Sequence, residues 1–452
     1  MRLRPEVLAL VAGVATAVAV AVVPAPDGLA AAADAPASGI LVLCTAPTWA
    51  EGTTYPAGSR VTYNGRLYES LVTHTPPPGA GWNPVAAPSL WRDLGACDGT
   101  PPPSPTPTRT PTPPPTTTPP PTTAPPPTTA PPGSETCPVK SKPTGKVLQG
   151  YWENWDGAAN GVHPPLGWIP ITDSRIRAHG YNVVNAAFPV IRSDGTVLWE
   201  DGMDATVRVP APAEMCQAKA AGLTILMSIG GATAGIDLSS TAVADRFVAT
   251  VVPILKSYNF DGIDIDIETG LVGSGNINQL STSQANLVRI IDGVLAQMPA
   301  NFGLTMAPET AYVTGGSVTY GSIWGAYLPI VKKYADNGRL WWLNMQYYNG
   351  SMYGCSGDSY SAGTVQGFTV QTNCLNTGLV VQGVTIRVPY DKQVPGLPAQ
   401  PGAGGGYMSP ALVAQAWNTY GGGLKGLMTW SLNWDGSKNW TFGDNVKAIQ
   451  GR

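Results

Sequence analysis

The segment Phe260–Glu268, which reads F-D-G-I-D-I-D-I-E, limits most strongly what this chain can fold into. Asp264, Asp266 and Glu268 alternate with isoleucines, and a period of two residues is the signature of a β-strand. The acids therefore share one face, about 6.6 to 6.8 Å apart along the strand, and the isoleucines cover the other. Asp261 is out of phase and is expected at the strand entry.

A row of carboxylates on one strand face is costly, because neighbouring acids repel each other and raise one another's proton affinity. Enzymes use this effect to keep an acid protonated near pH 7. A solvated acidic face is an alternative, but its reverse face is rarely all isoleucine. A calcium or magnesium site is another, but calcium loops place turn residues and backbone carbonyls between their acids. The pattern therefore favours catalytic carboxylates.

Strand-like and helical stretches alternate over residues 137–452. This order predicts an α/β fold, a (β/α)8 TIM barrel, with its active site at the C-terminal ends of the strands. Glu268, at the end of the fourth strand, is then expected to face the cleft. The stretch Thr364–Tyr390 does not fit the alternation and is interpreted as a helix plus a docked loop. The predicted strands are Val147–Trp152, Val183–Val190, Thr224–Ile229, Gly262–Glu268, Gly303–Ala307, Trp341–Tyr348, Gln393–Leu397 and Gly426–Ser431.

Residues 99–136 are rich in Pro and Thr and are interpreted as a linker. Such a composition cannot form a core and favours extended polyproline conformations, so it could span about 100 Å. Its threonines offer sites for O-glycans.

Residues 1–33 have the pattern of a secretory signal peptide: M-R-L-R, an apolar run from Val7 to Val23, and an Ala-rich zone at Leu29–Ala33. The apolar run is close to spanning length, which leaves an uncleaved anchor open. We expect a secreted, extracellular protein with no membrane contact after cleavage.

Residues 44–98 form a short, aromatic-rich unit, in which Tyr63-Asn64-Gly65 predicts a hairpin turn. The unit is therefore expected to be a small all-β module. Some of its aromatic residues must form its core, and flat aromatic faces also stack on the apolar faces of sugar rings. A module of this kind, tethered by a linker, suggests a binding appendage.

The net charge of −3 and the 12% of charged residues argue against nucleic-acid binding. Six cysteines in an exported chain suggest disulfides, with fifteen possible connectivities. Their positions along the chain suggest, as a hypothesis, the pairs Cys44–Cys97, Cys137–Cys216 and Cys355–Cys374. With three histidines and no C-x-x-C spacing, no metal site is expected. No cofactor is expected either.

The module carries W-x5-Y-x2-G-x2-V-T-Y-N-G-R-L-Y, then H-T, G-W-N-P and S-L-W. This pattern resembles a family 5/12 carbohydrate-binding module that adsorbs to chitin. The resemblance implies that Trp82, beside Pro84 and Pro88, contacts chitin. An aromatic pair used by other members is replaced here by Glu69-Ser70-Leu71.

The fourth-strand motif D-x-x-D-x-D-x-E resembles the signature of glycoside hydrolase family 18, the chitinase family. S-I-G-G at Ser228–Gly231, M-A-P-E at Met306–Glu309, Q-Y-Y-N at Gln346–Asn349 and M-T-W at Met428–Trp430 match further strands in order. G-Y-W-E-N-W at Gly150–Trp155 is similar to the first strand of bacterial members.

Glycosidic cleavage needs an acid for the leaving oxygen, and Glu268 suits that role, its proton affinity raised by Asp266. The resemblance implies that Asp266 orients the substrate's 2-acetamido group, which acts as the nucleophile in place of a second carboxylate. Asp264 would tune Asp266 by sharing a proton, so that the group titrates as a unit. Tyr348 would hydrogen-bond the acetamido oxygen.

The resemblance also implies a set of substrate-binding residues around these acids. Trp430 would form the floor under the scissile sugar, although Trp430 and Tyr348 could each be barrel core instead. G-A-G-G-G at Gly402–Gly406 is interpreted as a turn, because it lacks the spacing and the Lys of a nucleotide loop. The remaining predicted substrate-binding residues of the barrel are Gln346, Asn349, Met306 and Trp152.

The sequence thus predicts a secreted, retaining, substrate-assisted chitinase that binds chitin and chitooligosaccharides and works as a monomer. Little sequence separates the last two strands, which suggests a shallow groove and endo action. An endo-β-N-acetylglucosaminidase acting on glycoprotein glycans is one alternative. A non-catalytic chitin-binding lectin is another, although such relatives usually lose the acid that Glu268 supplies here.

Overall fold

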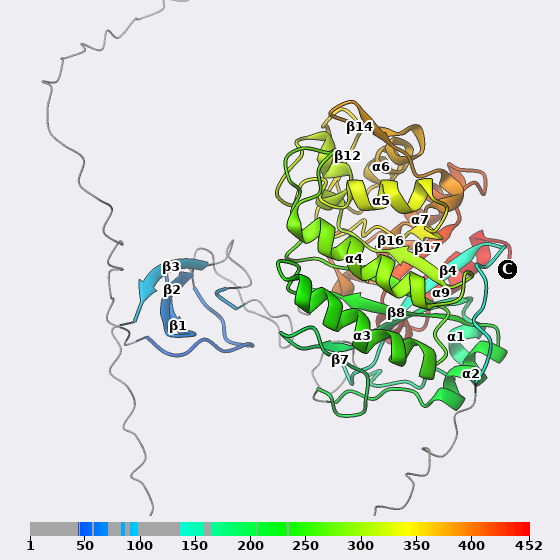
Figure 1. Ribbon diagram of the computed structural model, residues 1–452, viewed down its shortest axis with the longest axis horizontal. Helices are drawn as coiled ribbons and strands as arrows, with labels where there is room; N and C mark the ends of the chain where they lie inside the picture. Colours follow the sequence, from blue (N-terminus) through cyan, green and yellow to red (C-terminus); the bar gives the residue numbers. More distant parts are fainter. Residues whose placement is uncertain are drawn as a thin grey trace, which may run out of the picture.

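The computed structural model of the protein describes residues 44, 46–56, 58–70, 83–85, 91–97, 136–157, 163, 165–204, 206–232 and 235–452. Within this part, the chain forms a three-stranded sheet before residue 98 and an eight-stranded sheet after residue 146 (Figure 1). No helix in the described part is long and apolar enough to cross a membrane.

The N-terminal unit is an antiparallel sheet of β1 (Arg60–Tyr63), β2 (Arg66–Ser70) and β3 (Trp91–Ala96). Asn64 and Gly65 have φ of 47° and 71°, as a two-residue hairpin requires, so the predicted turn is confirmed. Tyr55 and Trp91 pack edge to face, with ring centroids 5.1 Å apart, and form part of the small core.

The larger sheet consists of eight parallel strands in the order β11-β10-β9-β8-β5-β4-β17-β16. The strands are β4 (Val147–Glu153), β5 (Val183–Ala187), β8 (Thr224–Gly230), β9 (Gly262–Asp266), β10 (Gly303–Met306), β11 (Trp342–Leu343), β16 (Gly396–Pro398) and β17 (Gly426–Trp430). Each of the eight predicted strands overlaps one of these, although β11 is much shorter than predicted.

Single parallel bridges join β11 to β16 and close the sheet into a barrel. Leu343 pairs with Gln393, and Gln346 pairs with Gly396. The amide of Gly396 donates to the carbonyl of Met345 at 2.9 Å. The predicted TIM barrel is confirmed.

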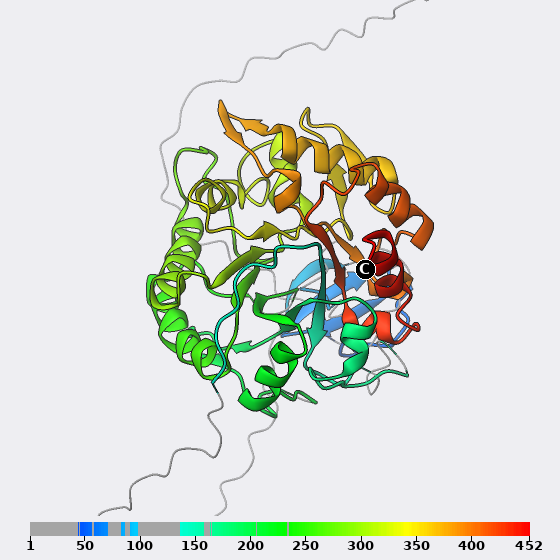
Figure 2. The same ribbon diagram turned by 90° about the vertical axis from the view of Figure 1, so that its right-hand side faces the viewer.

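Helices surround the strands (Figure 2). Serines begin the two longest, since the Ser240 hydroxyl accepts from the amide of Val243, and Ser281 forms a capping box with Gln284. The helices are α1 (Ser174–Ala178), α2 (Pro212–Ala220), α3 (Thr241–Ser257), α4 (Thr282–Gln297), α5 (Leu328–Asp336), α6 (Val365–Thr377), α7 (Pro410–Asn418), α8 (Leu432–Gly436) and α9 (Thr441–Ile449).

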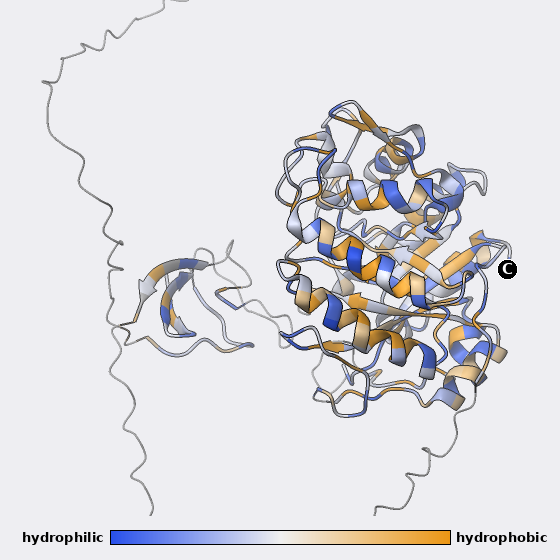
Figure 3. Ribbon diagram, in the orientation of Figure 1, coloured by the Kyte–Doolittle hydropathy of each residue, from blue (hydrophilic) through white to orange (hydrophobic). Residues whose placement is uncertain are grey.

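Two layers of apolar side chains fill the barrel domain. One lies between strands and helices, where the apolar face of α3, with Phe247 and Val251, meets Ile263 and Ile265 of β9. Helices α3 and α4 accordingly alternate apolar and polar residues along their length (Figure 3). The other layer lies inside the barrel and includes Trp342.

Short hairpins extend the barrel domain. The stretch Thr364–Tyr390, predicted as a helix plus a loop, contains α6 followed by the hairpin of β14 and β15. The hairpin strands are β6 (Val190–Ile191), β7 (Val197–Leu198), β12 (Ser351–Tyr353), β13 (Ser359–Ser361), β14 (Leu379–Val381) and β15 (Val384–Ile386).

Three disulfides join the six cysteines: Cys44–Cys97, Cys137–Cys216 and Cys355–Cys374. These are the pairs suggested by the positions of the cysteines along the chain. The first lies within the N-terminal unit, the second joins the start of the barrel domain to α2, and the third joins the segment after β12 to α6.

A buried ion pair closes the N-terminal end of the barrel. Asp261, just before β9 as predicted, lies 2.7 Å from the ammonium of Lys219, and the two side chains are 0% and 3% exposed. The amides of Lys140 and Ile225 donate to the same carboxylate at 2.7 and 2.9 Å. Every oxygen of this acid is therefore matched by a donor.

Candidate active site

The acidic strand lies as its alternation predicts. In β9, Asp264 and Asp266 point into the barrel, and Ile263 and Ile265 belong to the layer beneath the helices. Asp264 is 0% exposed and Asp266 is 3% exposed, while Glu268, just beyond the strand, is partly exposed. The acids thus lead from the barrel interior to its open C-terminal end.

Asp264 accepts hydrogen bonds from four neutral donors. The Tyr151 and Ser228 hydroxyls donate to its Oδ2 at 2.6 and 2.8 Å. The Thr305 hydroxyl and the Asn344 amide donate to its Oδ1 at 2.5 and 3.1 Å. Burial raises the pKa of Asp264 and these donors oppose the rise, whereas the pKa of Asp266 is raised further by two neighbouring acids, so the proton that Asp264 was predicted to share is better placed on Asp266.

One amide holds the other two acids together. Gln346 Nε2 donates to Asp266 Oδ1 at 2.9 Å and to Glu268 Oε1 at 3.0 Å. The carbonyl of Ala307 lies 3.0 Å from the same nitrogen, so its two N–H groups are shared among three acceptors at the ends of the strands. A neutral clamp of this kind aligns two carboxyl groups without neutralising either.

The acids have raised pKa values. Burial, Glu268 and Asp264 raise the pKa of Asp266 well above its ordinary value. Burial also raises the pKa of Glu268, while hydrogen bonds with Gln346 and Asp266 oppose the rise. The sequence attributes the proton affinity of Glu268 to Asp266, whereas in the structure burial is its largest cause. The two groups interact directly and titrate as a pair.

Tyr348 lies beside the pair and is 6% exposed. Burial and the charges of Asp266 and Glu268 raise the pKa of its phenol well above 10, so the hydroxyl keeps its proton. Among the described residues this hydroxyl has no hydrogen-bond partner, whereas the neighbouring Tyr347 turns to the helix side and bonds Thr372 at 3.0 Å. Tyr348 is therefore a free donor at the site.

Three partly exposed aromatic side chains lie together at the ends of β4, β5 and β17. The ring centroids of Trp430 lie 6.2 Å from Trp155 and 6.0 Å from Phe188, and those of Trp155 and Phe188 are 6.4 Å apart. Tyr151, which bonds Asp264, is 5.5 Å from Trp430. We name Trp155, Phe188 and Trp430 the aromatic floor.

Asn349 reaches the site edge but is already engaged. It has φ of 58°, and its side-chain oxygen accepts from the amide of Gly405 at 2.7 Å. The glycine stretch that includes Gly405 is thus a turn pinned by Asn349. A hollow beside it is lined by Asn349, Gly350, Ala362, Gly405 and Gly406.

Two predicted substrate-binding residues do not join the site, and these predictions are wrong. Trp152 is 0% exposed, belongs to the layer beneath the helices, and donates its indole N–H to Ile169. Met306 belongs to the same layer and is also 0% exposed. In each case a neighbour one residue away, Tyr151 or Ala307, points into the barrel instead.

Glu309, Trp155 and Tyr151 are site residues that the sequence analysis quoted in motifs but did not assign. Burial and the nearby Glu268 raise the pKa of Glu309 to about 7. Its backbone pairs with that of Gln346, which places it next to the clamp. Their signal was position: Trp155 and Glu309 follow the ends of barrel strands, and Tyr151 lies in the C-terminal half of one.

Trp82 and Pro88, predicted to contact or flank chitin, lie outside the described residues, and Pro84 lies within them. The same holds for the predicted linker up to residue 135 and for residues 1–43. Across the described part of the chain, no group of three or more His, Cys, Asp or Glu is arranged to hold a metal ion.

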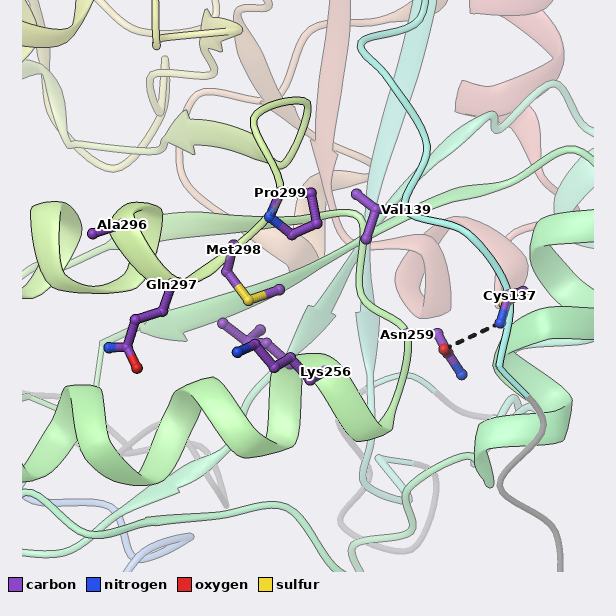
Figure 4. Close-up of a pocket in the computed structure, with 9 residues that line it drawn as sticks. Cys137, Val139, Lys256, Asn259, Ala296, Gln297, Met298 and Pro299 are labelled. Atoms are coloured by element: carbon purple, nitrogen blue, oxygen red, sulfur yellow. Dashed lines mark hydrogen bonds between the residues drawn. The ribbon is translucent and has the colours of Figure 1, made fainter.

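A pocket opens at the opposite end of the barrel, beside the ends of α3 and α4 (Figure 4). Its lining includes Lys256 and Met298, and Asn259 accepts from the amide of Cys137 there at 3.2 Å. No carboxylate lines it, so it lacks the groups that glycosidic cleavage needs.

Comparison with known proteins matches residues 48–92 to carbohydrate-binding module family 5/12 and residues 147–336 to glycosyl hydrolases family 18. Endochitinase 4 of Metarhizium robertsii is 81% identical over 315 residues, 70% of this chain and 91% of the relative. Endochitinase 37 of Trichoderma harzianum is 82% identical over 310 residues, 69% of this chain and 92% of the relative.

Among solved structures, a family GH18 chitinase from Chromobacterium violaceum has a TM-score of 0.58 at 28% identity, covering 90% of this chain and 100% of that one. Both family resemblances inferred from the sequence agree with these matches. The narrower likeness of Gly150–Trp155 to bacterial members is not borne out, because three relatives above 80% identity are all fungal.

Proposed function

The chain belongs to glycosyl hydrolases family 18 and carries a family 5/12 carbohydrate-binding module, and from this premise we propose that it is an endo-acting chitinase. It hydrolyses polymers of β-1,4-linked N-acetylglucosamine. One observation carries the proposal: Asp264, Asp266 and Glu268 form a graded row at the open end of the barrel, held by neutral donors and unpaired with any cation among the described residues.

Glu268 is the proton donor. It is the most exposed of the three acids, and its raised pKa keeps it protonated further toward neutral pH than an ordinary carboxyl. It gives its proton to the glycosidic oxygen as the bond from that oxygen to the sugar's C1 breaks. It then accepts a proton from the water that opens the intermediate.

The substrate's own acetamido oxygen is the nucleophile. As the bond at C1 breaks, this oxygen bonds to C1 and gives a cyclic oxazolinium ion, which water opens with overall retention. Asp266 orients the acetamido group and balances the positive charge of the ion. Asp264, held in place by four donors, acts on Asp266 through its negative charge. Tyr348, with its free hydroxyl, donates to the acetamido oxygen.

The substrate-binding residues proposed for the barrel are Trp430, Gln346 and Asn349. Trp430 offers its partly exposed indole as a floor for the sugar ring. Gln346 keeps Asp266 and Glu268 aligned. Asn349 shapes the groove edge through Gly405 rather than by its own amide oxygen, which is occupied.

The proposed organisation adds a signal peptide at residues 1–33, a chitin-binding module at 44–98, a linker at 99–136 and a catalytic domain at 137–452. The protein is then secreted, works outside the cell as a monomer, and is held on chitin by its module. Trp82 is the proposed contact to chitin. Trp82→Ala is expected to weaken adsorption to crystalline chitin severalfold and to leave cleavage of soluble oligomers unchanged, and unchanged adsorption would remove Trp82 from the binding face.

A side-by-side assay on colloidal chitin, a soluble chitin oligomer and a high-mannose glycopeptide tests the function. We expect cleavage of chitin and of the oligomer, with a spread of product lengths at early times. Release of glycan from the glycopeptide alone would identify an endo-β-N-acetylglucosaminidase. Adsorption to chitin without any cleavage would identify a lectin, and early release of dimers alone would contradict endo action.

A further inference from the structure

A second buried acid lies at the C-terminal end of the barrel, outside the acidic row. Glu153, the last residue of β4, is about 1% exposed at its side chain, and the ring of His163 is 0% exposed. His163 Nε2 lies 2.6 Å from Glu153 Oε2. A buried ion pair of this kind costs desolvation, and removing one partner would leave the other charge buried without compensation.

The ring of His163 is held from both sides. Its Nδ1 lies 2.5 Å from the carbonyl of Leu166, which can only accept. With a carboxylate at Nε2 and a carbonyl at Nδ1, both ring nitrogens donate and the imidazole is a cation. Burial lowers the pKa of His163, but the hydrogen bond and charge of Glu153 outweigh it, and the pKa lies above its ordinary value.

The other oxygen of Glu153 reaches the residue that follows Trp430. Ser431 donates its hydroxyl to Glu153 Oε1 in a short hydrogen bond. Asn433 accepts from the Glu153 amide at 3.0 Å, and Trp434 packs edge to face on His163 with centroids 5.6 Å apart. The chain on the C-terminal side of Trp430 is therefore fixed to β4 at two points and to His163 at a third.

The same pair also borders the remainder of the aromatic floor. Trp155 lies two residues after Glu153, and between them Asn154 donates to the carbonyl of Phe188 at 3.0 Å. Gly157 has no room for a side chain, because a Cβ there would lie 2.2 Å from the ring of His163. On one side of Trp155 the chain is thus tied to Phe188, and on the other it packs closely on His163.

We propose that Glu153, His163 and Ser431 form a positioning cluster that sets the angle of the aromatic floor under the substrate. The cluster touches neither the acids nor the reacting bond, so it acts on sugar binding and not on proton transfer. This inference rests on the proposed function, because it takes Trp430 as the sugar's floor.

Kinetics of the full chain on a soluble chitin oligomer test the cluster. Ser431→Ala cuts the link to Glu153, and we expect KM to rise roughly three- to tenfold, the worth of one aromatic contact, with kcat within about twofold. Glu153→Gln can still accept from Ser431 and donate to a neutral His163, so it should keep a KM near that of the unaltered chain. Glu153→Ala should raise KM at least as much as Ser431→Ala.

Ser431 also caps α8, since it accepts from the amide of Trp434 at 3.1 Å. Ser240→Ala is the matched control, because Ser240 caps α3 and touches no site residue. Both variants lose a helix cap, and Ser431→Ala also loses the bond to Glu153, so only Ser431→Ala should change KM. An unaltered KM in Ser431→Ala, or an equal rise in Ser240→Ala, would overturn the proposal, and both variants keep it testable should Glu153→Ala fail to fold.

A Trp430→Ala variant separates this inference from the proposed function. A raised KM in Trp430→Ala with a normal KM in Ser431→Ala overturns only the positioning cluster. A normal KM in Trp430→Ala would overturn both the role of Trp430 as the sugar's floor and the role of the positioning cluster. The absence of any oligomer cleavage by the unaltered chain overturns the proposed function itself.

Discussion

Two buried carboxylates on one stretch of chain, Asp261 and Asp266, lie at opposite ends of the barrel and have opposite surroundings. Asp261 has the ammonium of Lys219 at 2.7 Å and two backbone donors. Asp266 has a neutral amide and two further acids, Asp264 and Glu268. Burial raises the pKa of both, but a cation opposes the rise at Asp261, while like charges add to it at Asp266.

The surroundings of these two acids show that one end of the barrel serves stability and the other serves catalysis. At the N-terminal end the charge of Asp261 is matched by that of Lys219, which holds the start of β9 to the end of α2. At the C-terminal end unmatched charge is kept in place by neutral donors, at a cost in stability, and protons become available for catalysis. In such barrels the catalytic residues lie at the C-terminal face.

The largest effect should follow from removing the proton donor. Glu268→Gln keeps the bond to Gln346 and should lower hydrolysis of a soluble chitin oligomer by roughly 10²- to 10⁴-fold. Its melting temperature should equal or exceed that of the unaltered chain, because an ionisable carboxyl crowded against Asp266 is replaced by a neutral amide. Turnover within tenfold of the unaltered chain would contradict the assignment of the acid.

At the N-terminal end of the barrel, a substitution should lower stability without changing catalysis. Lys219→Met leaves Asp261 buried without its cation and should lower the free energy of unfolding by about 3 to 5 kcal/mol. Urea unfolding measures this, and kcat at low temperature should not change. Lys332→Met, which breaks the exposed pair with Asp336, is the control and should have a much smaller effect. A changed kcat in Lys219→Met would mean that the two ends are coupled.

Tyr347 and Tyr348 allow the same comparison between a stabilising side chain and a catalytic one, at neighbouring positions in the chain. Tyr348→Phe removes the free hydroxyl at the site and should lower kcat by roughly 10²-fold, the range for one lost transition-state donor. Tyr347→Phe removes a hydroxyl that bonds Thr372 on the helix side and should lower stability by about 1 kcal/mol, with kcat kept. Steady-state kinetics and thermal unfolding of both variants check this. Equal kcat values would argue that Tyr348 is a packing residue.

The smallest expected effect is a shift in pH dependence. Glu309 adds negative charge near Glu268, so Glu309→Gln should make Glu268 easier to ionise and move the alkaline limb of kcat/KM to lower pH by less than about one unit.

Stability gives the second readout for Glu309. Its pKa is raised to about 7, so the stability that its protonated form contributes is present below its ordinary value of 4.5 and is lost as pH rises through 7. Glu309→Gln should therefore gain on the unaltered chain between these values, whereas Glu214→Gln, which alters an exposed helix cap, should not. An alkaline limb that stays in place in Glu309→Gln would show that its charge does not reach the acid.

The orientation of the acids in β9 could be predicted from the sequence, because this strand alternates acidic residues with isoleucines, and the two types cannot share a face. The prediction failed for Trp152 because all seven residues of β4 are buried, so no alternation marks which side faces the barrel interior. Met306 in β10 failed for the same reason. The role of Gln346 as a clamp could not be predicted either, because it depends on the segment after β11 lying beside the end of β9 in the folded barrel.

The pairing of His163 with Glu153 could not be predicted from the sequence either. A single histidine between prolines and glycines carries no periodic signal, and its partner Glu153 is ten residues away, at a strand end. Only the fold brings them together beside Trp430.

The short joint between β11 and β16 has a consequence for how the barrel opens. Elsewhere neighbouring strands share two to five paired residues, but here single bridges at Leu343 and Gln346 close the ring. Local unfolding should start at this joint, so the amides of Val394 and Gly396 should exchange with deuterium before those of β9. Because Gln346 belongs to the joint, a chain opened there releases the clamp on Asp266 and Glu268. On heating, the enzyme should therefore lose activity at a temperature at which most of its barrel is still folded.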